Sequence, residues 1–267
     1  MRASDPLDRA VPLALDGWRG VRAGGFDPAR LSSCLSSTDP GELVKSTGRK
    51  SPRHLPSAPP VAITRYALFA RPARWLRRSR AIRAFRAAER LLAIGIPAAR
   101  PLFAARGPRE ERLGVEWIPG AQTLTAAVYA GALPPGPSRT LARLVARAHA
   151  SGIRLRDLRA ENILLGGDGR IVFVDFDGVR KLRTGRKAAD DLSRLSASFP
   201  PGGPVTDAVR MRFLARYLRE RAALGGPVSD PHAFARRAAR RTRQRWRRWE
   251  RRGFTLSPRG LAHADAR

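Results

Sequence analysis

The 267-residue chain has a single cysteine, Cys34, and only four lysines, at positions 45, 50, 181 and 187. One cysteine excludes an internal disulfide and a zinc site built from several thiolates, and it is compatible with a reducing cytoplasm. Cys34 lies in a serine-rich stretch without a neighbouring base, so we expect it to be unreactive. The four histidines are scattered and predict no metal site.

Long hydrophobic runs are also missing. Without about 18 consecutive apolar residues, no membrane-spanning helix is predicted. Asp and Pro residues interrupt the N-terminal stretch, so it has no apolar core of the kind found in signal peptides. We therefore expect a cytoplasmic location.

Positive charge is abundant. The formal net charge is +30, and 48 of the 52 basic residues are arginines. Such a surface attracts polyanions, including nucleic acid, anionic lipid head groups and phosphorylated glycolipids. With 43% hydrophobic residues the chain is still typical of a globular protein.

The stretch 152–179 carries three polar residues at a spacing that suits phosphoryl transfer. Asn162 follows Asp157 by five residues, and Asp175 ends an apolar segment. One carboxylate can accept the proton of an attacking hydroxyl, while an amide oxygen and a second carboxylate can hold Mg²⁺ on nucleotide phosphates. R-D-L-x-x-x-N keeps the spacing of a kinase catalytic loop, with Leu155 where His is usual, and D-F-D keeps the Asp and Phe of D-F-G.

The surrounding pattern supports this interpretation. Residues 163–165 and 171–174 read as two short strands joined by a glycine-rich turn, which puts Asp175 at a strand end beside the loop. The alternative is an ordinary hairpin with surface acids.

Hydrophobic periodicity predicts α+β organisation with two lobes. We expect an irregular extension over 1–40, a small β-sheet lobe with one helix over 41–119, a helical lobe over 120–230, and a basic helix and tail over 231–267. Residues 46–60 are expected to form a long turn. The clearest helix is 79–94, with Ala81, Phe85, Ala88 and Leu92 on its apolar face. Further strands are expected at 42–45, 61–66, 101–105 and 113–117, and further helices at 124–129, 139–150, 191–198, 209–224 and 234–252.

From about residue 61 to 217 the order of motifs resembles the lipopolysaccharide kinase (Kdo/WaaP) family, which has a protein-kinase-like fold. The similar stretches are RAIRAFRAAERLLAIGIPAARPL, VEWIPGAQTL, RAHASGIRLRDLRAENILL, VFVDFDGV and DLSRLSASF. The resemblance implies an ATP- and Mg²⁺-dependent kinase that phosphorylates a sugar hydroxyl of the lipopolysaccharide inner core, on Kdo or heptose, or of a related phosphorylated glycolipid.

The resemblance also assigns roles to residues. It makes Asp157 the catalytic base, Asn162 and Asp175 the magnesium ligands, and Glu116, Trp117 and Ile118 the lining of the adenine pocket. Asp191 would brace the catalytic loop, or alternatively serve only as a helix N-cap.

Two departures concern the grip on the nucleotide phosphates. Thr64 stands where kinases have the lysine of V-A-I-K, and Ala84 stands where its glutamate partner is expected. Lys45 on the preceding strand is a candidate substitute, with Glu89 as a carboxylate that needs a cation, either Lys45, Arg65 or another arginine. No G-x-G-x-x-G loop precedes Thr64.

The segment 232–252 contains ten arginines with Trp246 and Trp249 three residues apart. It resembles an interfacial helix that contacts an anionic inner membrane from its cytoplasmic face. The alternative is a basic helix packed on the protein by its tryptophans. Direct nucleic-acid binding is not expected, since no nucleic-acid module is visible, and no oligomeric state is predicted.

The sequence therefore predicts a lipopolysaccharide-type sugar kinase. Three other functions stay open: a pseudokinase that serves as a nucleotide-binding scaffold, a kinase of the same fold with another small-molecule or protein substrate, and a polyanion-binding protein without a nucleotide role.

Overall fold

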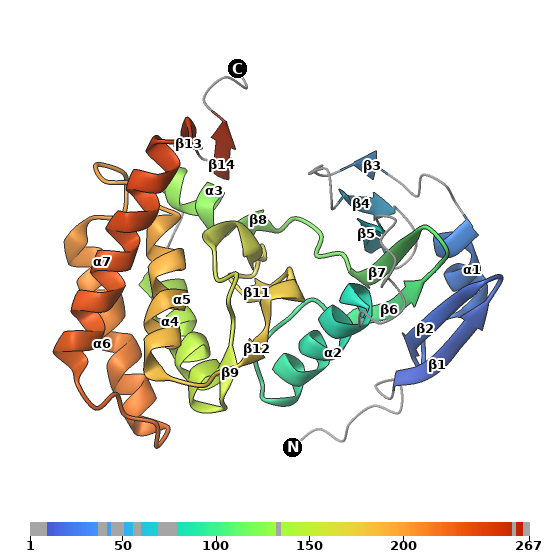
Figure 1. The fold of residues 1–267 in the computed structure, drawn as a ribbon, viewed down its shortest axis with the longest axis horizontal. Coiled ribbons are helices and arrows are strands. Elements are labelled where there is room, and N and C mark those ends of the chain that lie inside the picture. Colours follow the sequence, from blue (N-terminus) through green and yellow to red (C-terminus); the bar gives the residue numbers. More distant parts are fainter. Residues whose placement is uncertain are drawn as a thin grey trace. The chain divides into compact units, whose positions relative to one another are not determined.

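The computed structural model describes residues 10–36, 42–43, 51–55, 60–68, 79–131, 135–257 and 260–263. The chain divides into an N-terminal unit, residues 1–92 and 99–118, and a C-terminal unit, residues 93–98 and 119–267 (Figure 1). A sheet dominates the first unit and helices dominate the second, which confirms the α+β prediction of a kinase-like fold.

The N-terminal unit is built on a seven-stranded antiparallel sheet with the order β1-β2-β6-β7-β5-β4-β3 (Figure 1). Its strands are β1 (Ala10–Leu15), β2 (Trp18–Ala23), β3 (Glu42–Leu43), β4 (Ser51–Leu55), β5 (Val61–Ala67), β6 (Pro101–Arg106) and β7 (Glu110–Glu116). The predicted strands near 42, 61, 101 and 113 are thus present.

The region expected to be irregular is instead part of this sheet. Strands β1 and β2 form a hairpin that extends the sheet beyond β6, and helix α1 (Pro28–Ser36) follows. Leu13, Leu31 and Leu35 are buried in one cluster with Phe103 of β6. Burial of these apolar side chains stabilises the folded segment. The expectation of a long turn over 46–60 is also wrong, because β4 lies within it.

Arg112 of β7 ties helix α1 to the sheet. Its Nη1 donates to the carbonyl of Cys34, and its Nε donates to Glu110 at 2.7 Å. The buried guanidinium also lies over the ring of Trp18, 5.0 Å from the centroid. Cys34 is buried there, and burial raises the pKa of its thiol to about 11, so the expected lack of reactivity agrees with its environment.

Helix α2 (Arg80–Ala93) forms where the periodicity predicts a helix, but its buried face is rotated. Ala81, Ala84, Phe85, Ala88 and Leu91 are buried, whereas Leu92 is 38% exposed. The expected face therefore included one wrong residue, because the i, i+3, i+4 and i+7 positions counted from Ala84 end at Leu91.

The N-terminus of α2 is held by a buried carboxylate from β7. Glu111 Oε2 accepts hydrogen bonds from the backbone N–H groups of Arg80, at 2.6 Å, and Ala81, at 3.1 Å. These amides lack intrahelical acceptors, and a negative charge at a helix N-terminus also suits the helix dipole.

The C-terminal unit contains five α-helices among its described residues. They are α3 (Leu124–Tyr129), α4 (Pro135–Ala150), α5 (Gly185–Ala197), α6 (Asp207–Ala223) and α7 (Pro231–Glu250). Short strands frame the loops: β8 (Gln122–Thr123), β9 (Ile153–Arg154), β10 (Ile163–Leu165), β11 (Ile171–Phe173) and β12 (Arg180–Lys181). A last hairpin, β13 (Phe254–Ser257) with β14 (Gly260–His263), follows α7.

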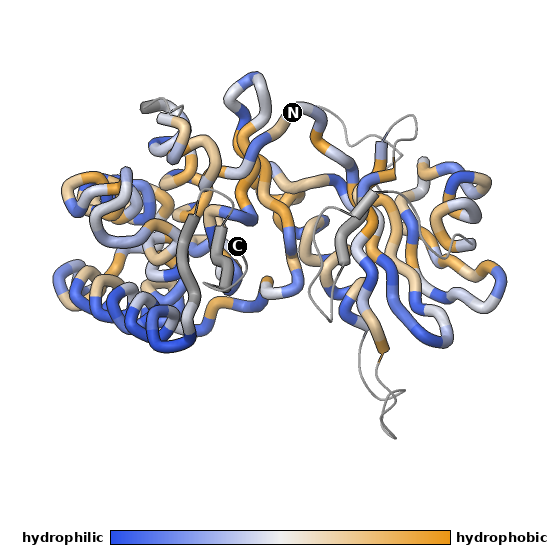
Figure 2. Tube along the Cα trace, turned by 90° about the horizontal axis from the view of Figure 1, so that it is seen from above, coloured by the Kyte–Doolittle hydropathy of each residue, from blue (hydrophilic) through white to orange (hydrophobic). Residues whose placement is uncertain are grey.

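Helix α7 packs along α5 (Figure 1). Thr242 donates to the carbonyl of Ser193, and Trp246 Nε1 donates to the carbonyl of Ala197 at 3.2 Å. The rest of α7 is rich in arginine and largely hydrophilic (Figure 2). No helix within the described ranges has the length and apolar character needed to cross a bilayer.

Candidate functional site

The candidate catalytic loop connects β9 to β10. A hydrogen bond from the Arg159 N–H to the Asp157 carbonyl (2.9 Å) and another from the Asn162 N–H to the Arg159 carbonyl (3.0 Å) fold it into a compact turn, which ends in a short 3-10 helix, Ala160–Asn162. Asp157 and Asn162 thus lie on one tightly wound piece of backbone.

Helix α5 holds this loop from inside the unit. The fully buried Asp191 accepts hydrogen bonds from the backbone N–H groups of Leu155, at 2.9 Å, and Arg156, at 3.2 Å. Ser198 Oγ accepts the N–H of Ala160 at 3.0 Å. Asp191 lies within α5, whose N-cap is Thr184, so the bracing role is confirmed and the N-cap alternative is wrong.

Cations compensate the buried charge of Asp191. Arg154 Nε donates to its Oδ1 at 3.2 Å, and Arg194 Nη1 lies 3.7 Å from the same oxygen. A buried carboxylate is tolerated only when it is paired and hydrogen-bonded, and Asp191 meets both conditions.

His149, at the end of α4, is part of the buried interior of the C-terminal unit. It is fully buried and forms a 2.8 Å hydrogen bond through Nδ1 with the Tyr217 hydroxyl. Its Nε2 lies 3.5 Å from Asp191, which is too long for a strong hydrogen bond. Burial lowers the pKa of His149 more than the neighbouring Asp191 raises it, so the ring is held neutral.

Asn162 links the other two candidate residues. Its Nδ2 donates to the Asp157 carbonyl at 3.0 Å, which directs the amide oxygen elsewhere. Its own carbonyl accepts the N–H of Val174 at 3.0 Å, directly before Asp175. Two hydrogen bonds therefore join Asp157, Asn162 and the strand end that carries Asp175.

The backbone at Asp175 adopts a left-handed conformation, with φ 63° and ψ 76°. A residue other than glycine is uncommon there and carries strain, which folded proteins tend to retain at functional sites. The turn that follows brings Gly178 against Asp157: a Cβ at Gly178 would lie 2.6 Å from Asp157 Oδ2. Only glycine leaves the Asp157 carboxylate in its place, a requirement that the sequence motifs do not reveal.

The donor chemistry fits magnesium. Carboxylate and amide oxygens are hard ligands, and Mg²⁺ in kinases typically takes one or two protein ligands and completes its shell with phosphate oxygens and water. Asp175 and Asn162 offer this set. The described residues hold no cluster of three or more acidic, histidine or cysteine side chains of the kind that binds a metal alone.

The remaining candidates belong to the N-terminal unit. Thr64 is half-buried on β5 and pairs with Leu113 of β7. Glu89 is half-buried on α2, and Ala84 of the same helix is fully buried. Arg65 forms an ion pair with Glu110 at 2.7 Å. Lys45 lies outside the described residues.

The predicted adenine-binding segment begins at Glu116, the last residue of β7. Glu116 N–H donates to the Arg100 carbonyl at 2.8 Å, and Trp117 N–H donates to the Pro60 carbonyl at 3.1 Å. The Trp117 ring stacks on His54, with centroids 4.2 Å apart, and Ile118 is half-buried beside it. The backbone of the segment is thus fixed to the residues that directly precede β6 and β5.

Comparison with known proteins identifies the family to which the chain belongs. The model of the lipopolysaccharide kinase (Kdo/WaaP) family matches residues 68–217, more than half of the sequence. The chain belongs to this family. A curated relative, the 3-deoxy-D-manno-octulosonic acid kinase of Vibrio parahaemolyticus serotype O3:K6 (strain RIMD 2210633), is 32% identical over 84 residues, which cover 32% of this chain and 35% of that protein. The match therefore spans about a third of the relative.

The match to the Kdo/WaaP family includes Asp157, Asn162, Asp175 and Asp191, the residues that the structure joins in one loop system. Family membership and the name of the relative indicate a kinase. Thr64 lies just before the matched range.

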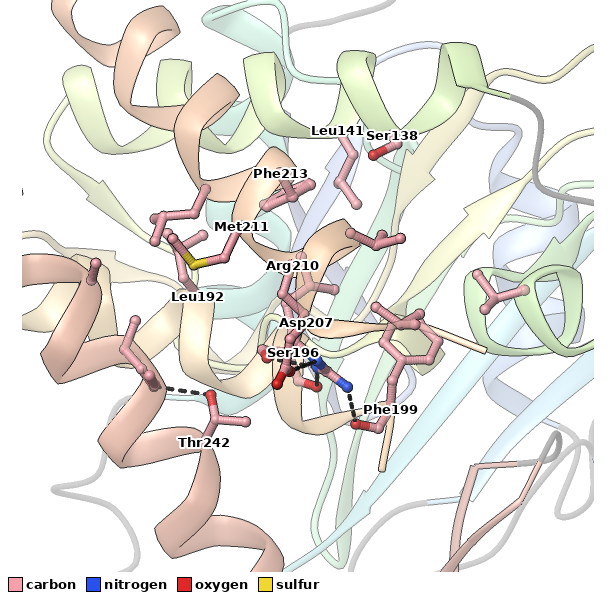
Figure 3. A pocket seen from close by; sticks show the side chains of 18 of the residues that line it. Ser138, Leu141, Leu192, Ser196, Phe199, Asp207, Arg210, Met211, Phe213 and Thr242 are labelled. Carbon is pink, nitrogen blue, oxygen red and sulfur yellow. Dashed lines mark hydrogen bonds and ion pairs between the residues drawn. The ribbon is translucent and has the colours of Figure 1, made fainter. Parts of the chain in front are cut away.

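A separate cavity of about 410 Å³ lies among the helices of this Kdo/WaaP family member (Figure 3). Its lining comes from α3 to α7 and is mostly apolar, with Phe199, Met211 and Phe213 among its residues. None of Asp157, Asn162 and Asp175 contributes to it. It is therefore distinct from the candidate site.

The two tryptophans of α7 contact other elements of the C-terminal unit. Besides its hydrogen bond to Ala197, Trp246 receives the guanidinium of Arg210, 5.1 Å from the ring centroid. Trp249 receives Arg159 of the catalytic loop at 5.8 Å. Both contacts correspond to the packing alternative for this helix. Sequence reasoning missed the link to Arg159, for which no local motif exists.

Proposed function

We propose that this Kdo/WaaP family protein transfers the γ-phosphate of ATP to a sugar hydroxyl, on Kdo or heptose, of the lipopolysaccharide inner core. Asp157 accepts the proton of the attacking hydroxyl. Asn162 and Asp175 would hold Mg²⁺, which would supply charge neutralisation at the nucleotide phosphates. The observation that carries the proposal is the hydrogen-bonded arrangement of these three residues in one loop system.

Catalysis in this scheme is positioning together with charge compensation. Asp191 and Ser198 fix the loop backbone, and Gly178 fixes the space of the Asp157 carboxylate. Because phosphoryl transfer needs little covalent participation from the protein, a rigid base and two metal ligands account for most of its contribution.

The nucleotide is proposed to bind the segment Glu116–Ile118 of the N-terminal unit. The N–H groups of Glu116 and Trp117 are already bonded to carbonyls within this unit, so the Ile118 N–H and the carbonyls of the segment are the groups assigned to the adenine edge. Lys45 remains the proposed cation for the α and β phosphates in place of Thr64, with Glu89 as its acidic partner.

The test is transfer of labelled phosphate from Mg-ATP to purified lipopolysaccharide core by the full chain. The wild type is expected to label the core, and Asp157→Asn is expected to lose about 10²- to 10⁴-fold in rate at unchanged thermal stability, since a positioned general base contributes about that factor. Full activity in Asp157→Asn would remove the assignment of the base.

A second candidate function is a nucleotide-binding scaffold without turnover. It is favoured by Thr64 and the buried Ala84, which leave the lysine and glutamate positions of active kinases unfilled. Protection of the protein by Mg-ATP in a thermal-shift experiment, combined with no transfer to any core acceptor, would support the scaffold.

We also propose that the protein binds the anionic inner membrane surface through α7. Arg236, Arg240, Arg243 and Arg247 recur every three or four residues, so they share one helix face, and all four are exposed. None of them forms an ion pair with any described residue, and each basic residue near an anionic surface contributes about 1 kcal/mol. Since the tryptophans are used in packing, the contact would be electrostatic.

Sedimentation with phosphatidylglycerol-containing vesicles tests this contact. Binding is expected at low salt, and it should weaken when the four arginines are replaced by glutamine. Equal binding of the wild type to neutral vesicles would contradict it.

A further inference from the structure

We propose that Trp249 of α7 is a positioning residue for the catalytic loop, acting through Arg159. This inference rests on the proposed function, because its consequence is read at Asp157 and Asn162. It assigns α7 a role in the candidate site, in addition to the proposed membrane contact of its exposed arginines.

Arg159 occupies the backbone connection between the proposed base and the proposed metal ligand. Its N–H donates to the Asp157 carbonyl at 2.9 Å, and its carbonyl accepts the Asn162 N–H at 3.0 Å. Both hydrogen bonds of the turn therefore pass through this one residue. Any rotation of the Arg159 backbone changes the separation of Asp157 and Asn162.

The Arg159 side chain contacts Trp249. Its guanidinium lies 5.8 Å from the centroid of the Trp249 ring, within the range of a cation–π contact. Among the described residues it also forms an ion pair with Glu161, whose Oε2 lies 3.6 Å from Nη1. The side chain is 33% exposed, so without the ring it would have several rotamers available in solvent.

Trp249 is itself presented from a fixed support. One turn before it, Trp246 is hydrogen-bonded to Ala197, and Thr242 and Arg245 contact the carbonyl and hydroxyl of Ser193. These contacts attach α7 to α5, whose Asp191 and C-cap residue Ser198 bind the same loop. The loop is thus held from its backbone by α5 and from its Arg159 side chain by α7.

The contact involves the face of an aromatic ring, which allows a matched comparison. Trp249→Phe retains a ring, whereas Trp249→Leu retains apolar bulk without a ring. If Trp249 only fills space, the two variants behave alike. If the ring positions Arg159, Trp249→Leu is expected to lower kcat about fivefold relative to Trp249→Phe, with an unchanged KM for ATP.

A double-mutant cycle with Arg159→Met tests whether the effect passes through Arg159. The proposal expects Trp249→Leu to have no further effect on kcat in the Arg159→Met background. Trp18→Phe is the control, since it alters a tryptophan of the N-terminal unit that contacts Arg112 and not Arg159, and it should be additive with Arg159→Met. Equal kcat of the Phe and Leu variants, or additivity of Trp249→Leu with Arg159→Met, would overturn the proposal.

Amide hydrogen exchange of residues 155–162 in the full chain gives a readout that needs no substrate. Faster exchange in Trp249→Leu than in Trp249→Phe supports the positioning role, and equal exchange in both contradicts it. Absence of phosphate transfer by the wild type would refute the proposed function alone, so the two failures are distinguishable.

Discussion

In the C-terminal unit, Asp157, Asn162 and Asp175 belong to one hydrogen-bonded loop system, and the buried Asp191 supports it. In the N-terminal unit, we assign Thr64 and the buried Ala84 to the positions at which kinases carry a phosphate-binding lysine and its glutamate partner. By this assignment, the N-terminal unit lacks both members of the lysine–glutamate pair. The C-terminal unit contains all three candidate catalytic and metal-binding residues.

This difference has a physical explanation. A lysine and a glutamate at those positions stabilise one another, and loss of one alone would leave a costly unpaired charge. Replacing both by small side chains removes that cost. In the proposed mechanism Asp157, Asn162 and Asp175 cannot be exchanged in this way, since each is assigned a separate task in the transfer step.

The largest effect is expected from Asp191→Ala. It removes the acceptor of two loop N–H groups and the partner of Arg154, which leaves a partly buried cation. Breaking such a pair costs about 3–5 kcal/mol, so the free energy of unfolding should fall by that amount in chemical denaturation, together with activity. Asp207→Ala is the control: its carboxylate is exposed and should contribute less than about 1 kcal/mol. An equal decrease in the free energy of unfolding in both variants would show that the buried Asp191 stabilises the protein no more than an exposed carboxylate does.

Lys45→Met tests whether Lys45 of the N-terminal unit binds the nucleotide phosphates. If Lys45 replaces the missing lysine, KM for ATP should rise about tenfold, in proportion to one lost charge-assisted contact of roughly 1.4 kcal/mol. Thr64→Lys in the same background should restore part of the affinity. An unchanged KM in Lys45→Met would mean that another group grips the phosphates.

Gly178→Ala is expected to lower kcat about tenfold without changing the affinity for ATP. The new Cβ would lie 2.6 Å from Asp157 Oδ2 and must displace the carboxylate, and small displacements of reacting groups are costly. Gly167→Ala in the β10–β11 turn is the matched control, because a Cβ there meets nothing within 4 Å. Steady-state kinetics of the two variants, with unchanged melting temperatures, would separate displacement of the base from a general loss of glycine.

The smallest expected effect concerns pH. The pKa of buried His149 is lowered from 6.5, so below pH 6.5 the unfolded chain binds a proton that the folded protein does not. Stability contributed by the neutral ring is complete above pH 6.5 and falls as the pH decreases toward the folded-state pKa, by at most about 1.4 kcal/mol per pH unit. Tyr217, Asp191, Arg154 and Arg221 surround this ring. The slope of unfolding free energy against pH should be shallower in His149→Gln; an identical slope would assign the effect to other groups.

Local sequence patterns predicted much of the fold. Helix α3 matches its expected range, and α2, β5, β6 and β10 agree within about a residue at each end. These segments have clear periodicity or clear breakers such as Gly95 and Pro97. The candidate catalytic motif was also readable, because Asp157 and Asn162 lie within a single short loop and Asp175 follows the next hairpin.

The rest depended on contacts between distant segments. Strand β1 contains Pro12, and β4 is short and polar, so neither shows strand periodicity; each forms by pairing with a neighbour in the sheet. The same reason applies to Gly178 at Asp157 and to Trp249 at Arg159. These pairs are 21 and 90 residues apart in the sequence, and no motif connects them.

The attachment of β1, β2 and α1 to the sheet has a practical consequence for truncation. A chain that starts at residue 41 would leave the backbone groups of β6 that pair with β2 without partners. It would also uncover the apolar side of Phe103 and leave the Arg112 guanidinium without the Cys34 carbonyl. An unpaired strand edge next to uncovered apolar residues promotes self-association, so the shortened protein should aggregate rather than behave as a minimal kinase.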